Sequence, residues 1–368
     1  MKATLTTLLA LAMLSGTAFA ITPTYVSSST GEVVVDPENP ENPQSFYGIY
    51  QEEKGSAVGA DVAIHEEAYG TDCLNRHVYG GYTYDWADDA VANNNKVTMT
   101  SGQVTSITVG ETWGGDANNN TFVMEGGTVF GDVQVSAPYA NSNGNVAILT
   151  GGSIEVSLTV GATYGEGYTA NNNKLHLVGE GAGEVSIGGV TYEHTNDISL
   201  GDVVVAGIDD GATAENNSID IYGAGIEATS LDGFDQLNFH MVDGLATTSG
   251  PMISLDGPLP LYTLLKDSSS LSLYGEAVTD WAAFEGKEVT LISNTAGIYV
   301  LSDTLKENYD ILDASGAIVA TATLSVVGSS GGPQSLVVSN IQSTVPEPTT
   351  GTLSLLALAG LCIRRRKH

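Results

Sequence analysis

Residues 93–110 read NNNKVTMTSGQVTSITVG: an asparagine cluster, a short apolar segment, a glycine turn and a second apolar segment. The same pattern recurs as NNNTFVMEGGTVFGDVQV from Asn118, NGNVAILTGGSIEVSLTVG from Asn143, NNNKLHLVGEGAGEVSIGG from Asn171 and NNSIDIYGAGIEATSL from Asn216. The starts are 25, 25, 28 and 45 residues apart, and the last interval has room for one coil plus a degenerate one. A repeat of this length indicates a stacked architecture.

Each unit predicts two short strands. Apolar residues alternate in both segments, for example Val97 and Met99 in the first and Ile107 and Val109 in the second. Alternation of this kind marks a strand with one buried face. Glycine and asparagine at the corners supply the positive φ angles that tight turns need.

A strand pair this short cannot bury its apolar face alone, so we expect each strand to pair with its copy one coil away. The predicted fold class is therefore all-β, a β-solenoid, with a right-handed parallel β-helix as the expected form. Asparagines at equivalent corners are expected to stack as a ladder of side-chain amides, represented by Asn94, Asn119 and Asn172. A ligand site at these asparagines is the alternative.

The chain divides into five predicted segments: a signal peptide over 1–20, a flexible proline-containing leader over 21–56, solenoid repeats over 57–230, an irregular β capping region over 231–341, and a sorting segment over 342–368. Short helices are expected around 261–266 and 279–284 within the capping region. A cap is expected because an uncovered solenoid end would expose a sheet edge that aggregates.

The repeat pattern resembles the repeats of autotransporter passengers, whose distal end is capped by irregular coils and hairpins. A true autotransporter ends in an outer-membrane barrel of many strands, whereas this chain ends in a basic tail. The resemblance therefore implies the passenger architecture without self-translocation.

The first 20 residues have the features of an export signal. Lys2 precedes an apolar run from Leu5 to Leu14, and Ala18 and Ala20 form a small-x-small cleavage site. We expect the mature chain to start near Ile21. Only Cys73 and Cys362 are present, and Cys362 lies in the tail, so no disulfide is expected within the mature chain and burial is expected for Cys73.

The tail VPEPTTGTLSLLALAGLCIRRRKH has three blocks in a fixed order: a Pro-Glu-Pro element, an apolar run and a basic cluster. It resembles the PEP-CTERM sorting signal, and the resemblance implies recognition by an exosortase-type membrane enzyme. The matching residues are Val345, Pro346, Glu347, Pro348, Arg364, Arg365, Arg366 and Lys367. A plain C-terminal membrane anchor, a transmembrane helix, is the alternative. The 15 residues from Thr349 to Ile363 fall short of the roughly 20 that a stable span needs, which favours a processed signal.

The chain is strongly acidic, with a net charge of −31. Only seven of the 12 basic residues, but all except one of the 43 acidic residues, lie between Ile21 and Val345. This charge repels nucleic acid and anionic lipid, so neither is an expected partner. Solubility of a surface protein and attraction of divalent cations are both compatible with it.

One loop of the first repeat combines aromatic and acidic residues and is the best candidate for a contact with a glycan or a cation. The candidate residues are Tyr82, Tyr84, Asp85, Trp86, Asp88 and Asp89, with Trp113 in the equivalent loop of the next coil. Aromatic faces stack on sugar rings, and carboxylates bind cations. A simple solvated loop is the alternative.

No catalytic, metal or cofactor motif is found: histidines and cysteines lack ligand spacing, and nucleotide and nucleophile signatures are missing. We therefore expect no enzyme activity, metal or cofactor. The sequence predicts an exported, surface-sorted protein with a structural or adhesive role at the cell envelope or in an extracellular matrix. Envelope or extracellular polysaccharide is an expected partner, the membrane is contacted through the tail, and a carbohydrate-binding or carbohydrate-cleaving β-helix is the alternative.

Overall fold

The computed structural model describes residues 23–41, 43–52, 55–67, 69–84, 89–138, 141–163, 165–208, 211–257, 271–298, 308–329 and 332–344. The predicted signal peptide with Ala18 and Ala20, the tail from Val345 onward and the expected helix over 261–266 lie outside these ranges.

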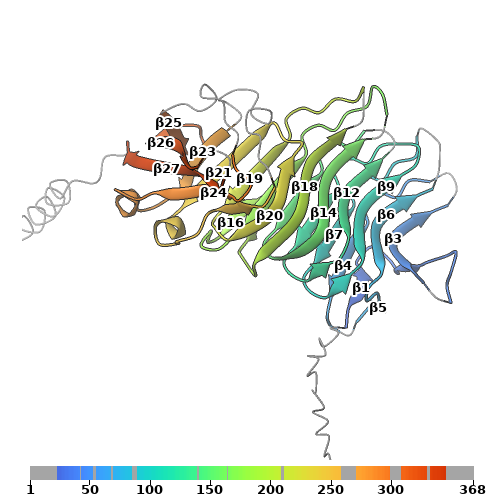
Figure 1. Cartoon of the computed structure of the whole chain (residues 1–368). Coiled ribbons are helices and arrows are strands. Elements are labelled where there is room, and N and C mark those ends of the chain that lie inside the picture. Colours follow the sequence, from blue (N-terminus) through green and yellow to red (C-terminus); the bar gives the residue numbers. More distant parts are fainter. Residues whose placement is uncertain are drawn as a thin grey trace, which may run out of the picture.

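The chain winds into an elongated column of stacked coils (Figure 1). Nearly all strands join one continuous sheet of 25 strands, and most neighbours within it run parallel. The described residues contain no α-helix and two short 3-10 helices, η1 (Asp243–Ala246) and η2 (Trp281–Phe284). The predicted all-β solenoid is therefore confirmed.

The first ladder holds the strand that follows each asparagine corner. Each strand of this ladder pairs parallel with the ladder strand of the next coil. In order, the ladder contains β4 (Asp61–His65), β7 (Lys96–Met99), β10 (Thr121–Met124), β13 (Val146–Leu149), β15 (Lys174–Val178), β19 (Ser218–Tyr222), β21 (Gln236–Val242), β23 (Leu271–Ala277) and β25 (Asn308–Leu312).

The second and third ladders hold the rest of each coil. The second contains β8 (Gln103–Val104), β11 (Thr128–Val129), the starts of β14 (Gly152–Thr163), β18 (Ile198–Ile208) and β20 (Ile226–Asp232), then β22 (Ile253–Leu255) and β24 (Val289–Asn294). The third contains β3 (Ser45–Gln51), β6 (His77–Thr83), β9 (Ser106–Thr112), β12 (Asp132–Pro138) and the ends of β14, β18 and β20.

One apolar core runs along the inside of the column. Inward positions of neighbouring coils stack in register, so Val97 lies beside Phe122 and Met99 beside Met124, all fully buried. Cys73 is fully buried in this core, as expected, and burial raises the pKa of its thiol to about 12. Because each coil covers its neighbours, burial in this fold depends on stacking.

The asparagine corners differ from the prediction in which residue forms the ladder. Asn94, Asn119 and Asn172, the middle residues, are exposed and have φ angles of 57°, 56° and 58°. They turn the corner in the left-handed region, which asparagine tolerates better than most residues. The predicted ladder role is therefore wrong for these three residues.

The third asparagine of each cluster forms the buried ladder instead. The backbone N–H of Asn95 donates to Oδ1 of Asn120 at 2.9 Å, and the same bond continues to the third asparagine of the following coils. The Asn120 side-chain amide also donates to the carbonyl of Ala92 at 2.9 Å. The buried ladder consists of Asn95, Asn120, Asn145, Asn173 and Asn217.

Both ends of the column are covered by antiparallel strands. At the first end, β1 (Tyr25–Ser28) pairs with β4 and with β5 (Thr71–Asp72), and β2 (Val34–Val35) pairs with β3. The segment predicted as a flexible leader over 21–56 thus contributes strands, and the column begins before residue 57. At the other end, β26 (Ile318–Gly328) and β27 (Gln334–Ser343) form a hairpin that pairs with β25 and β24, as expected of a capping region.

The long interval before Asn216 holds one coil and an insertion. β15 pairs directly with β19, so no degenerate coil lies between them. The extra residues include an antiparallel hairpin of β16 (Val185–Ile187) and β17 (Val190–Tyr192). Among the described residues, no helix has the length and apolar character needed to cross a membrane.

Candidate functional site

Two pairs of stacked tyrosines lie on the outer face of the third ladder, at its first end. Tyr47 of β3 stacks on Tyr79 of β6 with ring centroids 4.8 Å apart, and Tyr50 stacks on Tyr82 at 5.5 Å with only 5° between the ring planes. The parallel register places Tyr47 beside Tyr79 and Tyr50 beside Tyr82. Stacked, offset rings of this kind stabilise one another and hold a fixed surface.

Two glycines explain why Tyr79 and Tyr82 of β6 both face outward. In β6, Gly80 and Gly81 lie between Tyr79 and Tyr82, and both glycines are buried. A side chain at Gly81 would meet Nδ2 of the ladder residue Asn95 at 2.5 Å. Two consecutive small residues of this strand therefore face inward, and the tyrosines on either side of them reach the surface.

Two further aromatic residues extend this surface. The indole N–H of Trp113 donates to the hydroxyl of Tyr82 at 3.2 Å, and the Tyr84 ring lies 5.4 Å from the Trp113 ring. Tyr84 is 47% exposed. We call the six residues the aromatic platform: Tyr47, Tyr50, Tyr79, Tyr82, Tyr84 and Trp113.

The carboxyl group of Glu111 lies within the aromatic platform. The register of β6 and β9 places Glu111 beside Tyr82. Burial raises the pKa of Glu111 to about 7, although a hydrogen bond from Trp113 acts in the opposite direction. Burial also raises the pKa of Tyr47 to about 12, so that its hydroxyl stays protonated at neutral pH.

The structure brings three of the predicted contact residues together, namely Tyr82, Tyr84 and Trp113. Asp89 lies in an exposed turn, and Asp85, Trp86 and Asp88 are outside the described residues. Four residues of the site, Tyr47, Tyr50, Tyr79 and Glu111, are not among those predicted from the sequence. The signal is present for the tyrosines, because SFYGIYQ in β3 and HVYGGYT in β6 share the spacing Tyr-Gly-x-Tyr.

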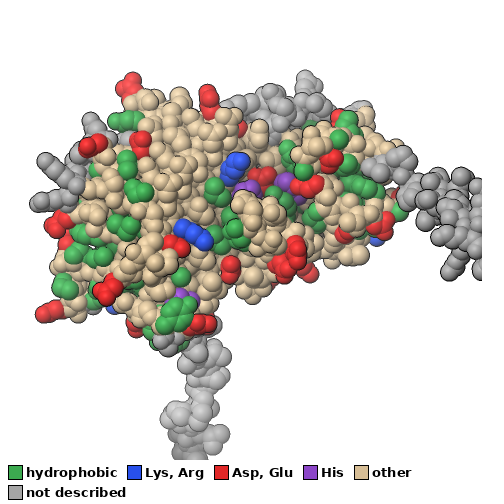
Figure 2. Space-filling view, turned by 180° about the vertical axis from the view of Figure 1, so that it is seen from behind, with side chains coloured by type: hydrophobic (Ala, Val, Ile, Leu, Met, Phe, Trp, Pro, Cys, Tyr) green, Lys and Arg blue, Asp and Glu red, His purple; other side chains and the backbone are tan. Residues whose placement is uncertain are grey.

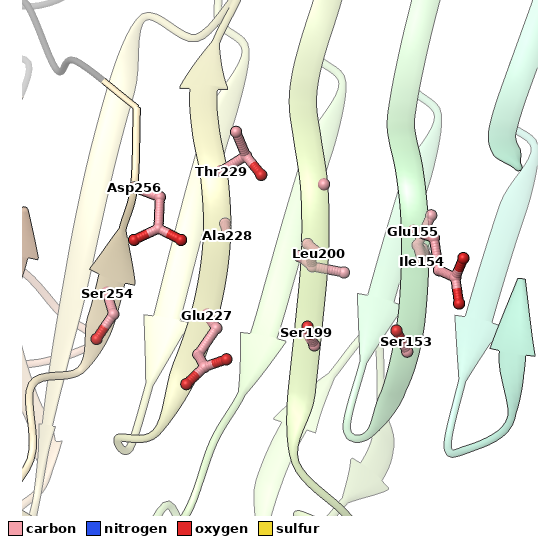
Figure 3. Close-up of a pocket in the computed structure, with 11 residues that line it drawn as sticks. Ser153, Ile154, Glu155, Ser199, Leu200, Glu227, Ala228, Thr229, Ser254 and Asp256 are labelled. Carbon is pink, nitrogen blue, oxygen red and sulfur yellow. The ribbon is translucent and has the colours of Figure 1, made fainter. Parts of the chain in front are cut away.

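A second feature is a shallow groove of about 360 Å³ across the starts of β14, β18, β20 and β22 (Figure 3). Hydroxyl and carboxylate groups line it in rows that follow the register of these strands. The polar lining residues are Ser153, Glu155, Ser199, Glu227, Thr229, Ser254 and Asp256.

A third feature is a cluster of ionisable groups on the first ladder, in which His240 is buried and Glu276 is exposed. Nε2 of His240 lies 3.1 Å from Oδ1 of Asp220, and Nδ1 lies 2.9 Å from Oε1 of Glu276. Rings of Tyr222 and Tyr274 stack on the two faces of His240, with centroid distances of 4.0 Å and 4.9 Å. Figure 2 shows histidine side chains beside acidic ones about halfway along the column.

The pKa values of the two histidines in this cluster are shifted in opposite directions. Burial alone would lower the pKa of His240, but hydrogen bonds and charge from Asp220 and Glu276 outweigh it, so the pKa is raised. Burial lowers the pKa of His176 to about 4, with only partial compensation from Asp220. Nδ1 of His176 lies 3.8 Å from Oδ2 of Asp220 and has no hydrogen-bond partner. His240 therefore favours the charged form and His176 the neutral form.

The described residues contain no group of three or more His, Cys, Asp or Glu side chains arranged to hold a metal ion. No family model, curated protein or solved structure matches the chain. The chemistry of these three features is therefore the basis for assigning a function.

Proposed function

We propose that the protein is an exported, surface-sorted β-solenoid that adheres to envelope or extracellular polysaccharide without cleaving it. The observation that supports this most directly is the aromatic platform, in which stacked rings on neighbouring coils present a fixed aromatic surface. Rings held by their neighbours lose little conformational freedom on binding, which favours contact with the flat faces of sugars.

The position of the aromatic platform suits a linear polymer. Its rows of residues cross β3, β6 and β9, and therefore run along the column axis. Coils repeat about every 4.8 Å along that axis, so a polymer lying on the platform would contact several coils at once. Many weak contacts on one rigid support give adhesion through avidity.

A carbohydrate-cleaving β-helix is the second candidate, and the groove in Figure 3 favours it. Hydrolysis of glycosidic bonds uses a pair of carboxyl groups that flank the bond. Glu155, Glu227 and Asp256 supply carboxylates on three different coils of that groove.

The proposed localisation rests on the signal peptide and on the C-terminal tail. The signal peptide over 1–20 directs export, and the tail Val345–His368 is the substrate of an exosortase-type enzyme that retains the protein at the cell surface. The membrane is contacted through this tail. Deleting Val345–His368 is expected to release the protein into the medium, and a truncated protein that stays cell-bound would exclude the tail as its anchor.

The adhesive function is tested with the exported chain on a glycan panel, with reducing ends and unsaturated products followed in parallel. Binding without turnover is expected, and it is expected to fall in Trp113→Ala and in the exposed variant Tyr84→Ala. Tyr192→Ala, on the inserted hairpin, is the matched control and should bind normally. Turnover that disappears in Glu227→Gln would replace adhesion with the cleaving candidate.

A further inference from the structure

Among the described residues, no positive charge pairs with Glu111. All salt bridges among the described residues lie within the cluster of His176, Asp220, His240 and Glu276, on the first ladder. Glu111 lies on the third ladder, where Trp113 supplies a neutral hydrogen-bond donor and Tyr82 lies beside it in the register. Its neighbour in the following coil is Ala137, which brings no charge.

This arrangement costs stability in the free protein. A carboxylate that is removed from water without a cation is unfavourable, and the raised pKa of Glu111 reflects that cost. Titratable groups held in such an environment are concentrated at binding and catalytic sites. A carboxylate of this kind becomes favourable when a ligand brings the missing positive charge.

The surrounding residues select the sign of the ligand charge. Burial raises the pKa of Tyr50, and the nearby negative charges of Glu52, Glu38 and Asp36 raise it further. Aromatic faces attract cations through their negative π surfaces, and Tyr82 of the aromatic platform lies beside Glu111 in the register. Uronic acids and sulfated sugars would be repelled by this acidic surrounding, whereas ammonium groups would be attracted.

We infer that the aromatic platform selects polysaccharides with free amino groups, and that Glu111 accepts a hydrogen bond from the sugar ammonium group. This inference rests on the proposed adhesion to polysaccharide and names the ligand class. In it, the tyrosine and tryptophan rings contact the faces of the sugar rings, while Glu111 determines specificity. The ammonium group supplies the charge that Glu111 lacks in the free protein.

The test compares three hexasaccharide probes by calorimetry: glucosamine, N-acetylglucosamine and glucose oligomers. The wild type is expected to bind the glucosamine oligomer about tenfold more tightly than the N-acetylated one, as a charge-assisted hydrogen bond would give. Glu111→Gln is expected to remove this preference, so that the glucosamine and N-acetylglucosamine oligomers bind with equal affinity. Glu184→Gln, at an exposed position next to the inserted hairpin, is the matched control and should keep the preference.

A pH series distinguishes recognition by Glu111 from a purely structural role, because a structural role would not make the preference depend on pH. The preference for the glucosamine oligomer should weaken as the pH falls below about 7, because Glu111 then takes up a proton. Equal affinities for all three oligomers, or a preference that persists in Glu111→Gln, would overturn the inference and leave polysaccharide adhesion intact. Failure of all three oligomers and of the wider panel to bind would instead remove the proposed function and this inference with it.

Discussion

Gly110 leaves the space that the side chain of Asn120 occupies: a Cβ on Gly110 would lie 2.5 Å from Nδ2 of Asn120. The same relationship joins Gly81 to Asn95, where a Cβ would also lie 2.5 Å from Nδ2. In the coil of Asn145, Ser136 replaces the glycine, and its hydroxyl accepts a hydrogen bond from the Asn145 amide at 3.2 Å. The glycine or serine of one corner and the asparagine of the next corner therefore form one structural unit.

The first prediction concerns the buried ladder. Asn120→Ala should lower the free energy of unfolding by about 1–3 kcal/mol, because it leaves the N–H of Asn95 and the carbonyl of Ala92 buried without their partner. Asn119→Gly is the matched control next to it, and it should change stability by less than about 0.5 kcal/mol because glycine accepts positive φ. Urea unfolding measures both. Equal losses in the two variants would contradict the ladder.

The second prediction concerns the space beside the ladder. Gly110→Ala should destabilise by about 1–3 kcal/mol, because the added methyl group forces Asn120 or the carbonyl of Ala92 to move. Gly250→Ala is the control, since an added Cβ there meets nothing within 4 Å. Thermal unfolding of both variants checks this. A Gly110→Ala variant as stable as the wild type would show that the corner adjusts freely.

Much of the fold can be predicted from the sequence, because aligning the repeats shows which residues are neighbours in successive coils. Once the asparagine clusters are aligned, the neighbours of Val97 and Met99 in the next coil are fixed. The NNN clusters do not show by themselves which asparagine turns inward, because all three positions have the same side chain, whereas Gly144 in the middle of NGN marks the position with positive φ. The difference lies in backbone φ, which places the middle residue in the left-handed region.

Two features depend on contacts that a local pattern does not contain. The sequence pattern places β3 in a flexible leader because a proline-containing segment precedes it and its partner β6 lies some 30 residues later. The cluster around His240 arises because His176, Asp220 and Asn238 occupy one register row on successive coils. Aligning KLHLV with SIDIY shows His176 opposite Asp220, but their burial becomes clear only from the packed structure.

The third prediction concerns the C-terminal cap. A chain that lacks residues 313–344, and therefore β26 and β27, leaves the edges of β24 and β25 without their antiparallel partners. Exposed parallel edges recruit other chains, so this variant should form soluble oligomers or aggregates. Light scattering on a size-exclusion column measures this. A monomeric truncated protein would show that the hairpin is not needed as a cap.

The fourth prediction is a pH-dependent contribution from His240. Its folded pKa is raised above the ordinary value near 6.5, so its stabilising effect is present below that value and lost as the pH rises through the folded pKa. Asp220 and Glu276 have lowered pKa values, because hydrogen bonds with His240 and its charge outweigh burial. Their effect is lost as the pH falls. His240→Gln should therefore be most destabilising between about pH 4.5 and 6.5.

His176 provides the control, because its pKa is shifted in the opposite direction from that of His240. Burial lowers its pKa to about 4, so the wild type loses stability as the pH falls below about 6.5, where the unfolded chain takes up the proton. His176→Gln should remove that loss. Unfolding curves across the pH range separate the two histidines. A His240→Gln difference that grows above pH 7 would contradict the assignment of charge to His240.

The last prediction concerns the stability cost of Glu111. Its folded pKa of about 7 lies above the ordinary value near 4.5, so the folded state holds the proton more tightly than the unfolded state. The contribution of Glu111 to stability should therefore fall as the pH rises from about 4.5 to about 7, and this loss should then remain constant. Glu111→Gln carries a neutral amide at every pH and should exceed the wild type by up to about 3 kcal/mol above pH 8, with little difference near pH 4.

Denaturant unfolding of the ligand-free wild type and of Glu111→Gln at both pH values measures this difference. A Glu111→Gln variant less stable than the wild type at high pH would mean that the carboxylate has a favourable partner in the free protein. The expected result, a variant that gains stability and loses its preference for amino sugars, would separate the two roles of this position. Stability favours a neutral side chain at position 111, whereas recognition of an ammonium group requires the carboxylate.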